Sequence, residues 1–123
     1  MMSYYLAIDM GASSGRHILG SIEDGKIKLE EIYRFENGIS KIGDEYCWDI
    51  QGLFNEIKKG IKKCKEIGKV PKTIGIDTWA VDFVLLDEND EMLGNAVAYR
   101  DDRTEGYMEK AFQVIPQDML YLY

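Results

Sequence analysis

A run of small residues between two apolar segments, Gly11-Ala-Ser-Ser-Gly15, constrains the fold more than any other feature of this chain. Residues 4–10 are apolar and partly β-branched, which predicts a buried strand, and residues 16–23 resume a strand pattern. Asp24-Gly25 favours a tight hairpin because both central residues need positive φ. Residues 26–35 then form the return strand, so the chain is predicted to open as a three-stranded antiparallel meander.

The rest of the chain mixes helical and strand patterns. Apolar residues recur at helical spacing over residues 50–68, with Asp49 as the N-cap and Gly60 placed for close approach to a sheet. Further elements are expected as a short buried strand at 73–78, strands at 81–87 and 95–99, and a helix at 101–115 that Pro116 ends. This order predicts an α/β fold.

Composition excludes several classes of protein. The chain has 22 acidic and 15 basic side chains and a net charge of −7, which argues against a nucleic-acid partner. No apolar run approaches the roughly 20 residues of a membrane span, so we expect a cytoplasmic protein without a membrane partner. Cys47 and Cys64 are expected to be free, buried thiols. His17, the single histidine, should face away from Arg16 and has no partners for a zinc or Ser-His-Asp site.

The small-residue bend has the composition of an anion site. It lacks the Gly-Lys-Ser/Thr of a Walker loop and the spacing of a dinucleotide fingerprint. Its backbone N–H groups, the hydroxyls of Ser13 and Ser14, and the Arg16 guanidinium suit phosphate oxygens. Asp9 would repel a phosphate unless magnesium lay between them, so we expect Asp9 to bind Mg²⁺. The alternative is a structural Gly/Ser turn beside a surface Asp.

A second strand end repeats the first. Ile8-Asp9 and Ile76-Asp77 both place an acid after alternating apolar residues. If the two strands are parallel neighbours, both acids reach the same sheet edge, where ligands of open α/β sheets bind. The alternative role for Asp77 is to orient a loop by hydrogen bonds.

A sugar site is indicated further along the chain. Trp79 offers an apolar wall for a sugar ring, and Asp82 and Arg100 offer directional polar groups. The alternatives are core packing for Trp79 and a salt bridge at a helix N-terminus for Arg100 and Asp101.

These motifs together resemble the FGGY carbohydrate kinases over essentially the whole chain. The bend from Asp9 to Arg16 resembles their first phosphate motif. The stretches that extend the resemblance are Tyr33-Arg-Phe-Glu-Asn-Gly38, Cys47-Trp-Asp49, Ile74-Gly-Ile-Asp-Thr-Trp-Ala-Val-Asp-Phe-Val-Leu-Leu-Asp87 and Ala96-Val-Ala-Tyr-Arg-Asp-Asp-Arg103. The resemblance implies a ribonuclease-H-like, actin-type ATPase fold, with the chain as part of the first domain.

The resemblance also implies an activity, which is transfer of the ATP γ-phosphate to the 1-hydroxyl of a ketose such as L-rhamnulose. Asp9 would hold the magnesium, and Ala80 would contact the sugar, flanked by Trp79 and Asp82. The residues implied to bind ATP are Gly11, Ala12, Ser13, Ser14, Gly15 and Arg16. No catalytic base is expected within these residues, because the family's catalytic aspartate lies beyond the matched segment.

Several expectations follow for the chain as a whole. Residues 1–123 are interpreted as the N-terminal part of a kinase's first domain, inactive alone because half of the catalytic apparatus is missing. The apolar run Met119-Leu-Tyr-Leu-Tyr123 favours self-association. The alternatives are a kinase for another ketose or polyol, a non-catalytic interaction module with the same fold, and a two-metal nuclease, for which only Asp9 and Asp77 are well placed.

Overall fold

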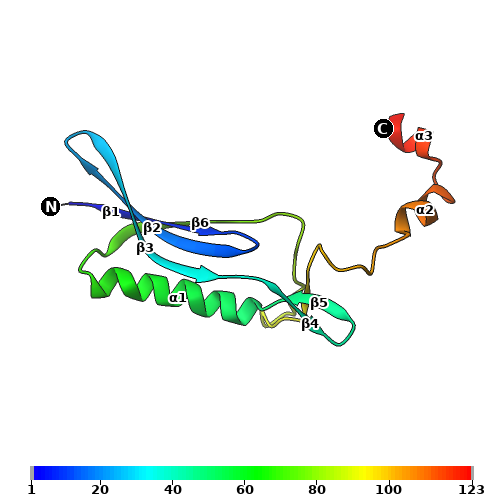
Figure 1. Ribbon diagram of the computed structural model, residues 1–123, viewed down its shortest axis with the longest axis horizontal. Coiled ribbons are helices and arrows are strands. Elements are labelled where there is room, and N and C mark those ends of the chain that lie inside the picture. Colours follow the sequence, from blue (N-terminus) through cyan, green and yellow to red (C-terminus); the bar gives the residue numbers. More distant parts are fainter. Residues whose placement is uncertain (1, 123) are drawn as a thin grey trace.

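The computed structural model describes residues 2–122 and is built around a four-stranded mixed sheet in the order β3-β2-β1-β6 (Figure 1). The strands are β1 (Tyr4–Met10), β2 (Ser14–Glu23), β3 (Lys26–Glu36) and β6 (Pro71–Thr78). The first three pair antiparallel in sequence order, whereas β6 lies parallel to β1 on its other side. The predicted meander is confirmed, as is the parallel pairing of the two strands that end in an acid.

The two turns of the meander have the backbone that their residues favour. Asp24 has φ 51° and Gly25 has φ 72°, so both occupy the left-handed region that a tight hairpin requires. The first turn, residues 11–13, joins β1 to β2 at the carboxyl end of β1. This turn is therefore at the sheet edge where β6 also ends.

Helix α1 (Ile50–Glu66) covers one face of the sheet, and Asp49 caps it by accepting the Gly52 N–H at 2.9 Å. The core between helix and sheet consists of Leu6, Ile8, Leu19 and Cys64. The predicted helix, its cap and the burial of Cys64 are confirmed.

Gly60 lets α1 approach the sheet closely. A Cβ at this position would lie 2.2 Å from Cδ2 of His17, whose side chain is fully buried. His17 faces α1 and Arg16 faces the opposite side of the sheet, as strand alternation requires. The expected close approach at Gly60 is confirmed.

A small second sheet was not predicted. It has the order β4-β5-β7 and is formed by β4 (Ile39–Ile42), β5 (Glu45–Trp48) and β7 (Ala96–Val97). Cys47 and Trp48 of β5 are buried, and Trp48 packs with Ala96 and Ala98. This sheet brings residues near the start of α1 beside residues near position 97.

Four details of the sequence prediction are wrong. Residues 81–87 form no strand and make only an isolated bridge between Leu86 and Met92, because no neighbouring strand pairs with them. The strand expected at 95–99 shortens to β7. The helix expected at 101–115 shortens to α2 (Tyr107–Phe112), since residues 101–106 turn instead. Strand β6 is mostly exposed rather than buried, because α1 packs over β1 to β3 and leaves this edge strand uncovered.

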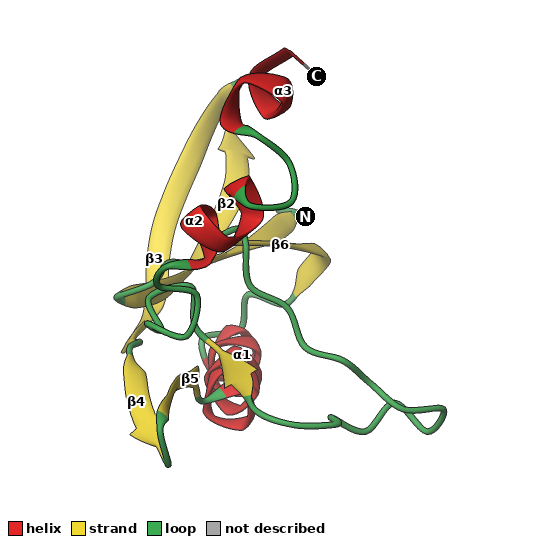
Figure 2. Ribbon diagram, turned by 90° about the vertical axis from the view of Figure 1, so that its right-hand side faces the viewer, coloured by secondary structure: helices red, strands yellow, loops and turns green. Residues whose placement is uncertain are grey.

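The last described residues extend away from the sheets. Helices α2 and α3 (Gln117–Leu122) lie apart from α1 and the four-stranded sheet in Figure 1, although they overlap the strands in the view along the molecule in Figure 2. Leu120, Tyr121 and Leu122 are exposed, while Tyr123 lies outside the described residues. Self-association through this apolar segment stays a prediction. Within residues 2–122, no helix is long and apolar enough to cross a membrane.

Candidate functional site

The turn between β1 and β2 is fixed by hydrogen bonds to its carbonyl oxygens. The Gly11 N–H donates to the Ser14 carbonyl at 2.9 Å. Asn37, at the end of β3, donates its side-chain Nδ2 to the Gly11 carbonyl at 2.9 Å and its backbone N–H to the Ser13 carbonyl at 3.0 Å. Asn37 thus stabilises the turn although it is not part of it, a role that was not predicted from the sequence.

Two backbone N–H donors of the turn make no hydrogen bond within the described part of the chain. Within residues 2–122, the N–H groups of Ala12 and Ser13 donate to no other group. The Ser13 side chain is exposed and that of Ser14 is half-buried. Because the carbonyls of Gly11 and Ser13 are engaged and these two donors are not, the turn has the kind of unused backbone N–H groups that an anion site requires.

Gly15 has a packing role at the base of the turn. It is buried in β2, and a Cβ there would lie 2.1 Å from Cζ of Phe35. Only glycine therefore fits beneath the Phe35 ring. Gly11 is less restricted, since an added Cβ would lie 3.0 Å from the Ser14 carbonyl oxygen.

Three charged side chains meet beside the turn, on the sheet face opposite α1. Asp9 pairs with Arg16 across β1 and β2 and with Asp77 across β1 and β6. Arg16 Nε lies 3.6 Å from Asp9 Oδ2, and the Asp9 side chain is 47% exposed. The prediction that Asp9 and Asp77 share one sheet edge is confirmed.

This arrangement fits a magnesium-bound phosphate. Arg16 Nε is buried and has no hydrogen-bond partner among the described residues, so a donor is left over for an anion. No group of three or more His, Cys, Asp or Glu residues within residues 2–122 could hold a metal ion by itself. Magnesium suits such a site, because it binds through one or two carboxylates and takes its other ligands from water and phosphates.

The second candidate region is organised by Asp82. Its Oδ2 accepts the indole N–H of Trp48 at 2.7 Å and that of Trp79 at 2.6 Å. The two indole rings contact each other with centroids 4.4 Å apart. Trp79 therefore packs against Trp48 and donates a hydrogen bond to Asp82, which confirms the alternative of core packing. Its role as a wall for a sugar ring stays a prediction.

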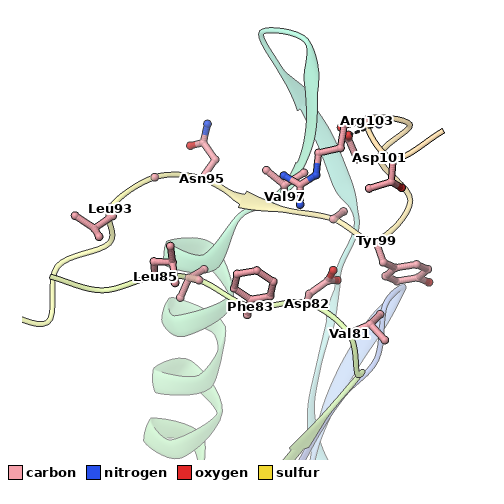
Figure 3. A pocket seen from close by; sticks show the side chains of 14 residues that line it. Val81, Asp82, Phe83, Leu85, Leu93, Asn95, Val97, Tyr99, Asp101 and Arg103 are labelled. Atoms are coloured by element: carbon pink, nitrogen blue, oxygen red, sulfur yellow. Dashed lines mark hydrogen bonds between the residues drawn. The ribbon is translucent and has the colours of Figure 1, made fainter. Parts of the chain in front are cut away.

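Asp82 also lines a pocket of about 460 Å³ (Figure 3). The pocket wall is apolar at Phe83, Val97 and Tyr99 and polar at Asn95, Asp101 and Arg103, among other residues. Mixed walls of this kind suit small polar ligands that have apolar faces. Three of the four predicted sugar residues lie outside the lining. Trp79 packs on Trp48, Ala80 is exposed, and Arg100 donates Nε to the Tyr99 hydroxyl at 2.9 Å.

Asp101 is an anchor rather than part of a salt bridge at a helix N-terminus. Its buried carboxylate accepts the Tyr46 N–H at 2.7 Å and the Arg103 N–H at 2.8 Å. These two donors lower the pKa of Asp101 below its ordinary value. Asp101 thereby ties the pocket's loop to β5, a function without a recognisable sequence signal.

Solved structures with the same fold are sugar kinases. The chain superposes on a gluconate kinase from Lactobacillus acidophilus with a TM-score of 0.77 and 15% identity, covering 98% of this chain and 24% of that one. A ligand-bound xylulose kinase from the same organism gives a TM-score of 0.74 at 15% identity, covering 97% and 24%. These likenesses define the fold as that of the actin-type sugar kinases, as predicted.

Sequence comparison identifies the family. Residues 4–121 match the N-terminal domain of the FGGY family of carbohydrate kinases, and the chain therefore belongs to that family. A rhamnulokinase from Halalkalibacterium halodurans is 55% identical over 98% of this chain and 26% of its own length. A rhamnulokinase from Bacillus subtilis is 44% identical over 95% and 24%. The chain spans about a quarter of the length of these curated relatives.

Proposed function

We propose that this chain is the N-terminal part of the first domain of a rhamnulokinase, which transfers the ATP γ-phosphate to the 1-hydroxyl of L-rhamnulose. Support comes from the identity of 55% to a rhamnulokinase over nearly the whole chain. The observation that carries the proposal is the turn after β1, where unused N–H groups and an Arg16 Nε that makes no hydrogen bond within residues 2–122 lie beside two carboxylates.

Within this proposal, each group at the turn has a distinct task. The N–H groups of Ala12 and Ser13, the serine hydroxyls and Arg16 bind and orient the phosphates of ATP. Asp9 holds magnesium directly or through water, and Asp77 lies where it can hold the same hydration shell. Gly11 and Gly15 act through their backbone, because neither carries a side chain. Magnesium-bound ATP supplies the phosphoryl group.

The sugar is proposed to lie beside Asp82. Asp82 and Trp79 contribute the polar group and the aromatic surface, and the proposed contacts of Ala80 and Arg100 would come from their exposed positions at the rim. No group placed as a base near the sugar's hydroxyl is proposed within the chain. A coupled ADP-release assay on the 123-residue chain alone should therefore show little or no turnover with L-rhamnulose.

A chimera tests the proposed function. Residues 4–121 would replace the matched segment of the Halalkalibacterium halodurans rhamnulokinase, whose remaining three quarters supply the rest of the enzyme. We expect ATP-dependent turnover with L-rhamnulose well above that with D-xylulose. The same chimera carrying Asp9→Asn is the matched control and should lose most turnover.

A folded chimera without turnover would contradict the kinase assignment. Preference for D-xylulose would instead favour a kinase for another ketose.

A further inference from the structure

We propose that Trp48 is a positioning residue of the sugar site, which together with Trp79 holds Asp82 as a preformed acceptor for ketose hydroxyl groups. This inference rests on the proposed function and deepens it. Trp48 lies on β5, 34 positions before Asp82, and is only 4% exposed. Its N–H nevertheless reaches Asp82 at 2.7 Å.

The two indoles fix the carboxylate from one side. An indole N–H can only donate, so Asp82 serves both rings as an acceptor. Both bonds end on the same oxygen, Oδ2, at 2.7 and 2.6 Å. Two donors on one oxygen hold Oδ2 in place, and hydrogen bonds to a charged acceptor are the stronger kind.

The other carboxylate oxygen is left for a ligand. Oδ1 of Asp82 makes no hydrogen bond with residues 2–122. The indoles line an apolar hollow of about 300 Å³ that also includes Asp82, whereas neither indole lines the mixed pocket of about 460 Å³. Asp82 therefore bridges the two spaces, and Figure 3 shows its carboxylate extending toward β7 and Tyr99. An anionic oxygen with both lone pairs free suits the hydroxyls of a sugar.

Backbone strain beside Asp82 independently points to a held geometry. Val81 has φ 72°, in the left-handed region that a β-branched residue rarely adopts. Such strain persists only where the surrounding structure enforces it, and it concentrates at ligand-binding sites. The hydrogen bonds from Trp48 and Trp79 to Asp82, the next residue in the chain, can enforce this backbone conformation of Val81.

The test uses the 123-residue chain, whose only two tryptophans are the two that bind Asp82. NMR spectra of ¹⁵N-labelled chain would contain two indole N–H signals, and Asp82→Asn should shift both. Addition of L-rhamnulose should also shift both signals in the unmutated chain, because the sugar binds the carboxylate that both rings hold. This measurement needs no variant of a buried residue.

Sugar affinity then separates positioning from packing. Trp48→Phe keeps an aromatic ring but removes the N–H, and we expect L-rhamnulose binding to weaken by about tenfold with magnesium-ATP binding unchanged. In an Asp82→Asn background, Trp48→Phe should weaken sugar binding no further. Far-ultraviolet circular dichroism checks that each variant is folded.

Four outcomes would overturn the inference. Indole N–H signals that do not shift in Asp82→Asn would show that the two tryptophans do not bind Asp82. Sugar binding that is unchanged in Trp48→Phe, or effects of the two substitutions that simply add, would show that Trp48 only packs, and the proposed function would stand. A chain that binds magnesium-ATP but gives no indole response to L-rhamnulose would remove both this inference and the proposed sugar site, while leaving the phosphate site.

Discussion

Replacement of Gly60 by alanine should destabilise this chain, although the same change in an ordinary helix interior stabilises by about 1 kcal/mol. The reason is His17, whose ring atoms Cδ2 and Nε2 would both lie 2.2 Å from the new Cβ. Relief of this overlap requires a shift of roughly 1 Å between α1 and β2, in a core that is closely packed. The shift would also strain the 3.2 Å hydrogen bond between His17 Nε2 and the Ile57 carbonyl.

The magnitude follows from three opposing contributions. Overpacking costs about 1–3 kcal/mol, and a weakened hydrogen bond costs up to about 1 kcal/mol. The gain in helix propensity offsets about 1 kcal/mol of this cost. The net prediction for Gly60→Ala is a loss of up to about 3 kcal/mol in the free energy of unfolding, measured by urea denaturation of the 123-residue chain.

The sign should invert when the ring is removed. In a His17→Ala background, Gly60→Ala should stabilise by up to about 1 kcal/mol, because its Cβ then meets open space. Lys62→Ala on the exposed side of α1 is the matched control and should change stability by less than about 0.5 kcal/mol. A gain in stability from Gly60→Ala with His17 present would refute the packing argument.

Three further predictions concern the stability of the same chain. Burial lowers the pKa of His17 below its ordinary value of about 6.5. The contribution of neutral His17 to the free energy of unfolding is therefore fully present above pH about 6.5 and is lost as the pH falls toward the native pKa. His17→Gln should remove this pH dependence of stability, as measured by urea titrations at several pH values. Asp49→Ala removes the acceptor of the Gly52 N–H and should cost about 1 kcal/mol by chemical denaturation, and an unchanged midpoint would argue against the cap. Gly15→Ala should cost about 1–3 kcal/mol through its overlap with Phe35, and a thermal melt at or above that of the parent chain would contradict this packing.

The meander and the main helix were predictable because local signals and burial agree there. Asp24-Gly25 dictates its turn, and Asp49 with the apolar stripe of α1 dictates the helix. Residues 81–87 read as a strand from their apolar alternation, but a strand exists only with a partner, and the described residues provide none beyond one bridge. The exposure of β6 likewise depends on which strands α1 covers, and the sequence of β6 does not indicate which strands these are.

At the candidate site, the sequence predicted functional residues but not the contacts that hold them in place. The juxtaposition of Asp9 and Asp77 was predictable, because the carboxyl ends of parallel strands meet at the same edge of a sheet. Two other contacts were not predictable, because each joins segments far apart in the chain. They are the hydrogen bonds from Asn37 to the first turn and the hydrogen bond from Trp48 to Asp82. Such contacts are set by the packing of the two sheets, so only the structure reveals them.

We propose that the turn after β1 binds a magnesium-bound triphosphate. NMR mapping of backbone amide shifts in the 123-residue chain, on addition of ATP with and without Mg²⁺, tests it directly. We expect shifts that are concentrated at residues 9–16, require Mg²⁺ and weaken strongly in Asp9→Asn. Shifts centred on the lysines of α1, or shifts at the turn that are the same without Mg²⁺, would contradict it.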